Sequence, residues 1–167
     1  RLITIFVHHK DVADIIKIKL EDICKENNTS VVNLSSDMNQ DERQRVIDKF
    51  LSGRSRVLIA STLASGEGLN LQKCSDMIML ERQWNPANEE QAEGRFSRIG
   101  SEASSINATY MLVTGTIDEY FAELVERKRQ YVAQTLGQTE VVEWEESNIM
   151  RELADLIASK GSQRWRL

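Results

Sequence analysis

The chain has 167 residues, of which 41% are hydrophobic, and a single domain of this length buries roughly 70% of the surface of its unfolded chain. Its 21 Lys and Arg residues are outnumbered by 26 Asp and Glu residues, and the net charge of −5 excludes a strongly basic module that binds nucleic acid by overall charge alone. Any nucleic-acid site must therefore be local.

The first part of the sequence alternates strand and helix patterns. Residues 2–7, LITIFV, form a continuous apolar run that is typical of a buried parallel strand. Apolar residues then recur every three or four positions, which predicts a helix over residues 10–26 (Val12, Ile16, Leu20 and Ile23). The sequence NNTS interrupts this pattern, and VVNL at residues 31–34 predicts a second strand.

The middle of the chain predicts a second helix and two further strands. Asn39, followed three residues later by Glu42, resembles a capping box that starts a helix ending at Gly53. RVLIA at residues 56–60 and DMIML at residues 76–80 then predict the third and fourth strands.

A third helix and a fifth strand come next. Asn85 and Pro86 suit the cap and the first turn of a helix that extends to about Ile99. NATYMLVT at residues 107–114 predicts the fifth strand.

Two more helices are predicted after the fifth strand. Thr116 with Glu119 resembles another capping box, for a helix that ends near Gly137. Residues 147–160 predict an amphipathic helix with one apolar stripe (Ile149, Leu153, Leu156 and Ile157).

Strands that alternate with helices at short spacing predict an α/β fold with a mostly parallel sheet flanked by helices. We expect this domain to cover residues 1–137, and residues 138–167 to form a linker and a brace-like helical extension. Because the chain begins without Met and directly with a predicted strand, we expect it to be a piece of a longer polypeptide.

The cysteines and the hydropathy favour a soluble, intracellular protein. Cys24 and Cys74 lack the spacing of a disulfide framework or of a metal site. No apolar run approaches the roughly 18 residues of a membrane span, and the opening sequence RLITIFVHHK lacks the features of a signal peptide.

A glycine-rich segment, STLASGEGLNLQ at residues 61–72, directly follows the third strand. Ligands of open α/β sheets bind at the carboxyl ends of strands, and hydroxyl groups with free backbone N–H groups can bind a phosphate there. The segment is not a dinucleotide fingerprint, because Leu71 stands where the third glycine would be. Taken alone, the glycine pair is explained better by a tight turn.

Two other features have structural explanations. His8 and His9 end the first strand, and adjacent strand residues point to opposite faces, so we expect a structural role and no shared metal. The Asp-Glu pairs at residues 41–42 and 118–119 lie at helix starts, where carboxylates complement the helix dipole, so we interpret them as capping groups.

The sequence QAEGRFSR, residues 91–98, places two arginines three residues apart. On a helix Arg95 and Arg98 would share one face, which Gln91 extends. Two neighbouring guanidinium groups suit a polyanion that spreads its charge over several oxygens, such as a phosphoryl group during transfer. The alternative is a pair of surface arginines bound to nearby acids (Glu90, Glu93 or Glu102).

Five segments in order resemble one family over about residues 1–137: ITIFVHHKDVADII, DERQRVIDKF, VLIASTLASGEGLNL, LERQWNPANEEQAEGRFSRIGSE and GTIDEYFAELVERK. They are similar to the C-terminal half of the motor of the Swi/Snf-type DNA-dependent ATPases, within the superfamily-two helicases. The resemblance implies the second of two RecA-like lobes, with ATP bound in the cleft between them. FVHHK and GTIDEYF favour the annealing-helicase or fork-remodelling branch over nucleosome remodellers.

The resemblance also implies site residues. Arg95 and Arg98 match the catalytic arginine fingers of the family. The residues implied to contact the nucleotide are Gln91, Asn70, Gly66 and Gly68. The residues implied to face DNA are Ser61, Thr62 and Trp84. The chain departs from the family pattern at Gly94, Ser97 and Ser101, and in the sequence SSDM after the second strand.

The cofactor implied by the resemblance is ATP with Mg²⁺. The sequence has no G-x-x-x-x-G-K-[ST] loop and no acidic box after a buried strand, so we expect the missing first lobe to hold the metal and most phosphate contacts, and no metal site in this chain.

We therefore predict the second motor lobe of an ATP-dependent double-stranded-DNA translocase, inactive without the first lobe of the same polypeptide. It would work in the cytoplasm of a prokaryote or of a virus-infected cell, or in a nucleus. One alternative is a lobe of another superfamily-two helicase that acts on RNA or DNA, which the sequence WNP at residues 84–86 disfavours. Another is a non-enzymatic interaction domain, which the presence of Gln91, Arg95 and Arg98 disfavours.

Overall fold

The computed structural model of the chain describes residues 1–35, 37–62, 70–83, 86–96 and 105–135, together with residues 151, 154, 155 and 158. The chain divides into two compact units. The first unit comprises Arg1–Glu81 with Ala87–Met111, and the second comprises Arg82–Pro86 with Leu112–Leu167. The predicted domain boundary between residues 137 and 138 lies outside the described residues.

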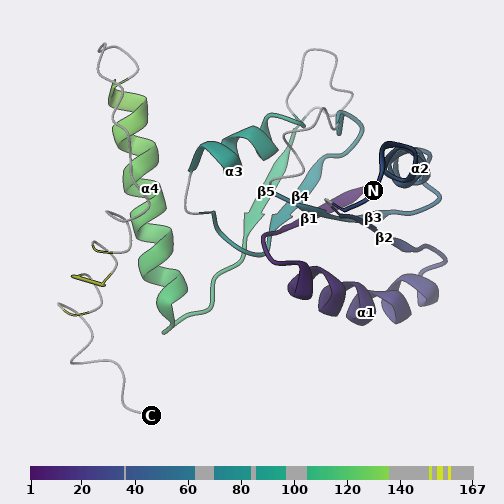
Figure 1. Cartoon of the computed structure of the whole chain (residues 1–167), viewed down its shortest axis with the longest axis horizontal. Coiled ribbons are helices and arrows are strands. Elements are labelled where there is room, and N and C mark those ends of the chain that lie inside the picture. The colour runs from purple at the N-terminus through teal and green to yellow at the C-terminus, as the bar shows by residue number, and fades with distance from the viewer. Residues whose placement is uncertain are drawn as a thin grey trace. The chain divides into compact units, whose positions relative to one another are not determined.

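The first unit is built on a five-stranded sheet in the order β2-β3-β1-β4-β5 (Figure 1). Its strands are β1 (Ile3–Val7), β2 (Val31–Leu34), β3 (Val57–Ser61), β4 (Asp76–Met79) and β5 (Asn107–Tyr110). All four pairings are parallel, which confirms the predicted α/β class. Parallel pairing places the carboxyl ends of all five strands at one edge of the sheet.

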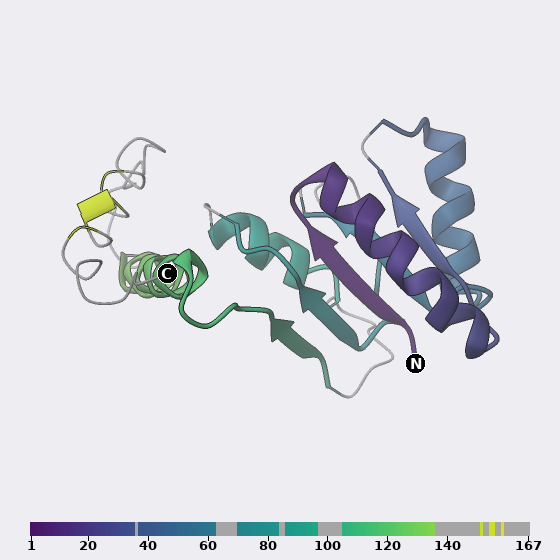
Figure 2. The ribbon, with the colours of Figure 1, turned by 90° about the horizontal axis from the view of Figure 1, so that it is seen from below.

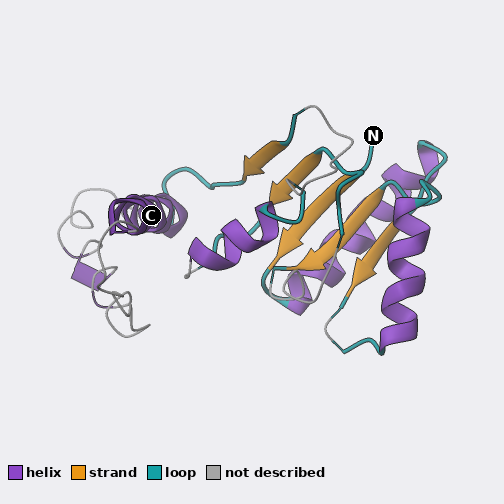
Figure 3. Ribbon diagram, turned by 90° about the horizontal axis from the view of Figure 1, so that it is seen from above, coloured by secondary structure: helices purple, strands orange, loops and turns teal. Residues whose placement is uncertain are grey.

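Helices cover both faces of this sheet (Figures 2 and 3). Helix α1 (Lys10–Glu26) packs on one face, where Ala13 and Cys24 join an apolar cluster with β1 and β3. The opposite face is covered by α2 (Gln40–Leu51) and α3 (Pro86–Glu93). This layered arrangement explains why the central strands read as continuous apolar runs, since both of their faces are buried.

The larger apolar cluster fixes the segment that follows α3. Phe6 of β1, Phe50 of α2 and Phe96 are fully buried there, and the rings of Phe6 and Phe96 meet edge to face with centroids 6.1 Å apart. A buried side chain of this size stabilises the fold by about 1.5–3 kcal/mol. Because Phe96 directly follows Arg95, the core restrains the backbone of one of the predicted site residues.

Helix α3 ends earlier than expected. Its last residue is Glu93, whereas the sequence predicted a helix to about Ile99, which itself lies outside the described residues. The N–H groups of Arg95 and Phe96 bond to carbonyls three residues back, at 3.1 and 3.0 Å, so the chain tightens into a turn after Gly94. Glycine is a poor helix former, and Arg95 therefore lies in this turn and not on the regular helix.

The fifth strand is also shorter than predicted. It ends at Tyr110, whereas the sequence predicted a strand to residue 114. The partner strand β4 ends at Met79, whose carbonyl accepts the last ladder bond from the N–H of Met111 at 2.9 Å. Without a further partner residue the strand stops, and Leu112 and Val113 are exposed.

The described part of the second unit contains α4 (Ile117–Thr135). The predicted cap residue, Thr116, accepts a hydrogen bond from the N–H of Asp118 at 3.2 Å, and Asp118 accepts one from the N–H of Val113 at 3.2 Å. Arg82 donates to Glu126 at 2.9 Å within the same unit. The apolar stripe predicted within residues 147–160 lies outside the described residues, although residues 151, 154, 155 and 158 are helical. No described helix is long and apolar enough to span a bilayer.

Helix α2 begins with the predicted capping box. The side chain of Asn39 accepts from the N–H of Glu42 at 2.9 Å, and the Glu42 carboxylate accepts from the N–H of Asn39 at 3.0 Å. We expect Asn39→Ala to lower the free energy of unfolding by about 1 kcal/mol, because it leaves an N-terminal N–H of the helix without its acceptor. Urea unfolding of the purified chain measures this loss. Gln40→Ala, at the neighbouring exposed position, is the control, and an equal effect of both substitutions would contradict the capping role.

Candidate functional site

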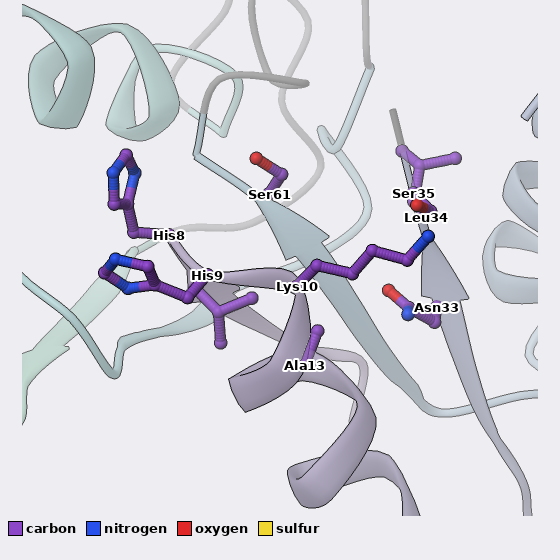
Figure 4. A pocket seen from close by; sticks show the side chains of 9 residues that line it. His8, His9, Lys10, Ala13, Asn33, Leu34, Ser35 and Ser61 are labelled. Atoms are coloured by element: carbon purple, nitrogen blue, oxygen red, sulfur yellow. The ribbon is translucent and has the colours of Figure 1, made fainter. Parts of the chain in front are cut away.

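An open depression lies beyond the carboxyl ends of β1, β2 and β3 (Figure 4). Its cavity volume is about 60 Å³, and it is open to solvent. The residues that line it come from the strand ends and from the start of α1 (Val7, His8, His9, Lys10, Ala13, Asn33, Leu34, Ser35 and Ser61). Ligands of parallel α/β sheets bind at this edge, so the depression is the candidate site.

The structure separates the two hydroxyl residues predicted to face DNA. Ser61 ends β3 and lines the depression. Thr62 is only 1% exposed, and both its N–H and its hydroxyl donate to the carbonyl of Val7, at 3.0 and 3.1 Å. The Thr62 hydroxyl therefore joins the end of β3 to the end of β1, whereas Ser61 is available at the depression.

The two histidines are held by a carboxylate at the end of β4. Oε2 of Glu81 accepts from the N–H groups of His8 and His9, at 2.7 and 3.0 Å, and its Oε1 lies 2.7 Å from Nδ1 of His9. Burial alone would raise the pKa of Glu81, but the hydrogen bonds from the backbone and ring of His9 and from the backbone of His8 outweigh burial and lower it. Glu81 therefore stays ionised at neutral pH and ties the turn before α1 to the end of β4.

The sequence did not single out Glu81. The predicted structural role of the histidines agrees with these bonds, but Glu81 is 72 residues from His9 in sequence. Only the strand order, which places β1 beside β4, brings the two together.

A second carboxylate lies at the same edge, beside a lysine. Nζ of Lys10, the first residue of α1, lies 2.5 Å from Oδ2 of Asp37, and the hydroxyl of Ser35 donates to the same carboxylate. These two hydrogen bonds, that of Lys10 first, lower the pKa of Asp37 to about 2. The bond to Asp37 likewise raises the pKa of Lys10. Both groups are therefore charged at neutral pH.

The structure describes two of the residues predicted to contact the nucleotide, Asn70 and Gln91, and one of the two predicted arginine fingers, Arg95. Asn70 is exposed, and its Oδ1 accepts from the N–H of Gln72 at 3.1 Å. Gln91 is exposed on α3. Arg95 is 8% exposed, and its carbonyl accepts from the N–H of Leu71 at 3.2 Å.

This backbone bond joins the two predicted nucleotide segments, because Leu71 directly follows Asn70. Arg95 is also not the surface arginine that the alternative interpretation required, since it is buried. The remaining predicted site residues lie outside the described part of the chain (Gly66, Gly68, Trp84 and Arg98).

The described residues suit an anion better than a metal ion. The depression offers donor groups on Lys10 and Ser61, and Asn70 and Gln91 carry exposed amide donors elsewhere on the chain. Among the residues that the structure describes, no group of three or more His, Cys, Asp or Glu side chains could hold a metal ion. These residues therefore fit a share of the phosphate contacts of a nucleotide or of DNA, and they do not supply the ligands of Mg²⁺.

Comparison with known proteins defines the class. Residues 1–100 match the family described as "Helicase conserved C-terminal domain". The human "DNA annealing helicase and endonuclease ZRANB3" is 33% identical over 125 residues, which are 74% of this chain and 12% of that protein. The Arabidopsis thaliana "DNA repair protein RAD5A" is 34% identical over 116 residues, which are 69% of this chain and 11% of that protein. The chain thus spans about an eighth of the length of these relatives.

Solved structures agree with these relatives. The "C-terminal part of Fun30 ATPase domain" superposes with a TM-score of 0.74 and 26% identity, covering 96% of this chain and 48% of that one. The "C-terminal domain of the DEAD-box protein Dbp5" superposes with a TM-score of 0.58 and 25% identity, covering 77% of this chain and 69% of that one.

The chain therefore belongs to the helicase conserved C-terminal domain family. Within that family it is a C-terminal, RecA-like lobe of the Swi/Snf type, which confirms the resemblance found in the sequence. Its relatives include proteins named as ATP-dependent helicases, such as the "Putative ATP-dependent helicase/translocase YwqA" of Bacillus subtilis, which is 38% identical over 96 residues.

We expect Glu81→Gln to lower the free energy of unfolding by about 1 kcal/mol at pH 7, because a neutral amide cannot replace an ionised acceptor of these N–H groups. A lowered pKa stabilises the folded state above the unfolded pKa, and this stabilisation is lost as the pH falls through the folded pKa. The difference between wild type and variant should therefore shrink below pH about 4.5.

Urea unfolding between pH 3.5 and 7 measures this difference. Glu26→Gln, an exposed carboxylate at the end of α1, is the control and should change little. A difference for Glu81→Gln that does not depend on pH would contradict the role of its charge.

Proposed function

We propose that this chain is the second motor lobe of an ATP-dependent double-stranded-DNA translocase, of the chromatin-remodelling or fork-remodelling type. The observation that carries the proposal is the position of the two ends of the segment 61–72, whose residues 63–69 lie outside the described part of the chain. This segment starts at Ser61 in the depression, and near its other end Leu71 bonds to the carbonyl of Arg95. One short segment thus connects the candidate DNA edge with the candidate nucleotide residues.

The DNA would lie against the carboxyl edge of the sheet. Ser61 and Lys10 would donate to backbone phosphates, and Trp84 is also expected to face DNA, whereas the buried Thr62 would support the end of β3 through its bonds to Val7. The net charge of −5 means that only a few local contacts can contribute. DNA binding by this lobe should therefore be weak and sensitive to salt. The DNA-related names of the relatives support DNA as the partner.

ATP with Mg²⁺ would bind between this lobe and the first lobe of the same polypeptide, which would hold the metal and most phosphate contacts. Mg²⁺ neutralises the charge of the phosphates that react. In this chain Asn70, Gln91, Gly66 and Gly68 would contribute donors to the nucleotide. Arg95 and Arg98 would act as arginine fingers, whose planar donor fork stabilises charge on the transferred phosphoryl group.

The burial of Arg95 sets a condition on this role. In the described unit its side chain is 8% exposed, so a finger role requires it to turn outward when the first lobe closes on the nucleotide. Closure that completes a catalytic site in this way is common in enzymes that bind ligands between domains.

Two alternatives remain distinct from this proposal. One alternative is a lobe of another superfamily-two helicase, acting on RNA or DNA; the likeness to the Dbp5 domain leaves it open, but the likeness to the Fun30 ATPase is greater by TM-score and by the share of this chain covered. A non-enzymatic interaction domain would keep the fold and lose the chemistry, and the retained Gln91, Arg95 and Arg98 argue against it. A protein with this function would work beside cellular or viral DNA, in a nucleus or in the cytoplasm of a prokaryote or of a virus-infected cell.

The isolated 167-residue chain should not hydrolyse ATP at a measurable rate, because its sequence has no loop that cradles the β-phosphate. A coupled ATPase assay with and without double-stranded DNA tests this expectation. The longer polypeptide that carries both lobes serves as the positive control. Robust, DNA-stimulated turnover by the isolated chain would contradict the two-lobe proposal.

In the two-lobe protein, Arg95→Ala and Arg98→Ala should each lower kcat by about 10³ to 10⁵ while ATP affinity changes far less. Lys should rescue poorly at either position, because a point charge does not reproduce the planar fork. Arg45→Ala, an exposed arginine on α2, is the control and should leave kcat within a few-fold of wild type.

Melting temperatures must accompany these assays, since Arg95 is buried. Turnover within a few-fold of wild type would reject the catalytic role. A loss that follows entirely from a lower melting temperature would make Arg95 a structural residue.

A further inference from the structure

An acidic residue lies where the proposed DNA edge would meet a phosphate. Asp37 follows β2 and belongs to the turn that borders the depression at Ser35. Figure 4 shows the side chain of Lys10 extending from the start of α1 toward Ser35 at the end of β2. The Asp37 carboxylate meets the ammonium group of Lys10 at 2.5 Å and accepts a hydrogen bond from the hydroxyl of Ser35.

The set of donors on this carboxylate is the kind that a phosphate uses. A backbone phosphate accepts hydrogen bonds from an ammonium group and a hydroxyl, as this carboxylate does. Arg43 of α2 lies beside the same turn, with its Nη1 donating to the carbonyl of Ser35 at 3.4 Å. The carboxylate thus lies among hydrogen-bond donors in a chain whose net charge is negative.

The contribution of this ion pair to folding is small. Both side chains are well exposed, at 64% for Lys10 and 61% for Asp37, and exposed ion pairs contribute little to stability. The position of the pair matters more than its strength. Asp37 binds Lys10, which is the only lysine that lines the depression in the described part of the chain.

We propose that Asp37 mimics a DNA phosphate in the DNA-free protein and so limits the affinity of this edge for DNA. The proposal rests on the DNA-binding function proposed above. DNA would have to displace the Asp37 carboxylate from Lys10 and Ser35 before a backbone phosphate could take its place. Weak binding lets a lobe release one phosphate and take the next, so this competition suits a protein that moves along DNA.

Removing the charge of Asp37 should therefore strengthen DNA binding. We expect Asp37→Asn to lower the Kd of the 167-residue chain for a 20-base-pair duplex about two- to fivefold at 0.1 M salt, which is the range that an exposed ion pair can supply. Fluorescence anisotropy of a labelled duplex measures the Kd. The melting temperature should not change, since the pair is exposed.

Asp22→Asn is the matched control. Asp22 also forms an exposed pair with a lysine, Lys25, at 3.5 Å, and its replacement changes the net charge by the same amount. It lies 12 residues after Lys10 on the same helix, which is about 18 Å along the axis and beyond the screening length of about 10 Å at this salt concentration. Asp22→Asn should leave the Kd unchanged.

Lys10→Gln tests whether the gain acts through Lys10. Lys10→Gln should raise the Kd, and adding Asp37→Asn to it should give no gain. An equal gain from Asp37→Asn and Asp22→Asn would overturn the proposal, because it would reflect net charge alone. A gain from Asp37→Asn that persists without Lys10 would overturn it as well.

The same variants separate this proposal from the proposed function. If Lys10→Gln weakens binding while Asp37→Asn has no effect, the DNA edge stands and the phosphate mimic is wrong. If neither substitution changes the Kd, the DNA edge at this depression is itself wrong.

Discussion

The parallel pairing of β1 with β3 and β4 is the constraint on which the candidate site depends. In this register Val7 lies beside Ser61, and Phe6 lies beside Met79. Thr62 reinforces it, because both its N–H and its hydroxyl bond to the carbonyl of Val7. The strands β1, β3 and β4 are far apart in sequence, but the segments that follow them therefore begin at the same edge of the sheet.

Two carboxylates at this edge have different effects. Glu81 accepts hydrogen bonds from backbone N–H groups, so it rigidifies the turn before α1, and these N–H groups stabilise its negative charge. Asp37 is exposed and bonds to movable side chains, so an anion can compete with it. A chain with a negative net charge can thus bind nucleic acid at one edge if the carboxylates there either accept backbone hydrogen bonds, as Glu81 does, or can be displaced by a phosphate, as is proposed for Asp37.

Local patterns in the sequence predicted local structure well. The capping box of Asn39 and Glu42, the bounds of α1 and the parallel α/β class all depend on neighbouring residues or on periodicity, and all are confirmed. The predicted end of α3 was wrong by several residues, because the helix ends where Gly94 and the buried Phe96 turn the chain. The contacts of Glu81 with His9 and of Lys10 with Asp37 were missed, because they join residues 72 and 27 positions apart. The burial of Thr62 likewise depends on which strand lies beside β3.

We propose that DNA binds this lobe at the carboxyl edge of its sheet. Titration of the isotopically labelled chain with a 20-base-pair duplex, followed by amide chemical shifts, tests it most directly. We expect the largest shifts at that edge, at His8, Lys10, Ser35 and Ser61. Residues at the amino ends of the strands, such as Leu2, Ser30, Arg56 and Ser75, should not move. The largest shifts at these amino-end residues would contradict DNA binding at the carboxyl edge.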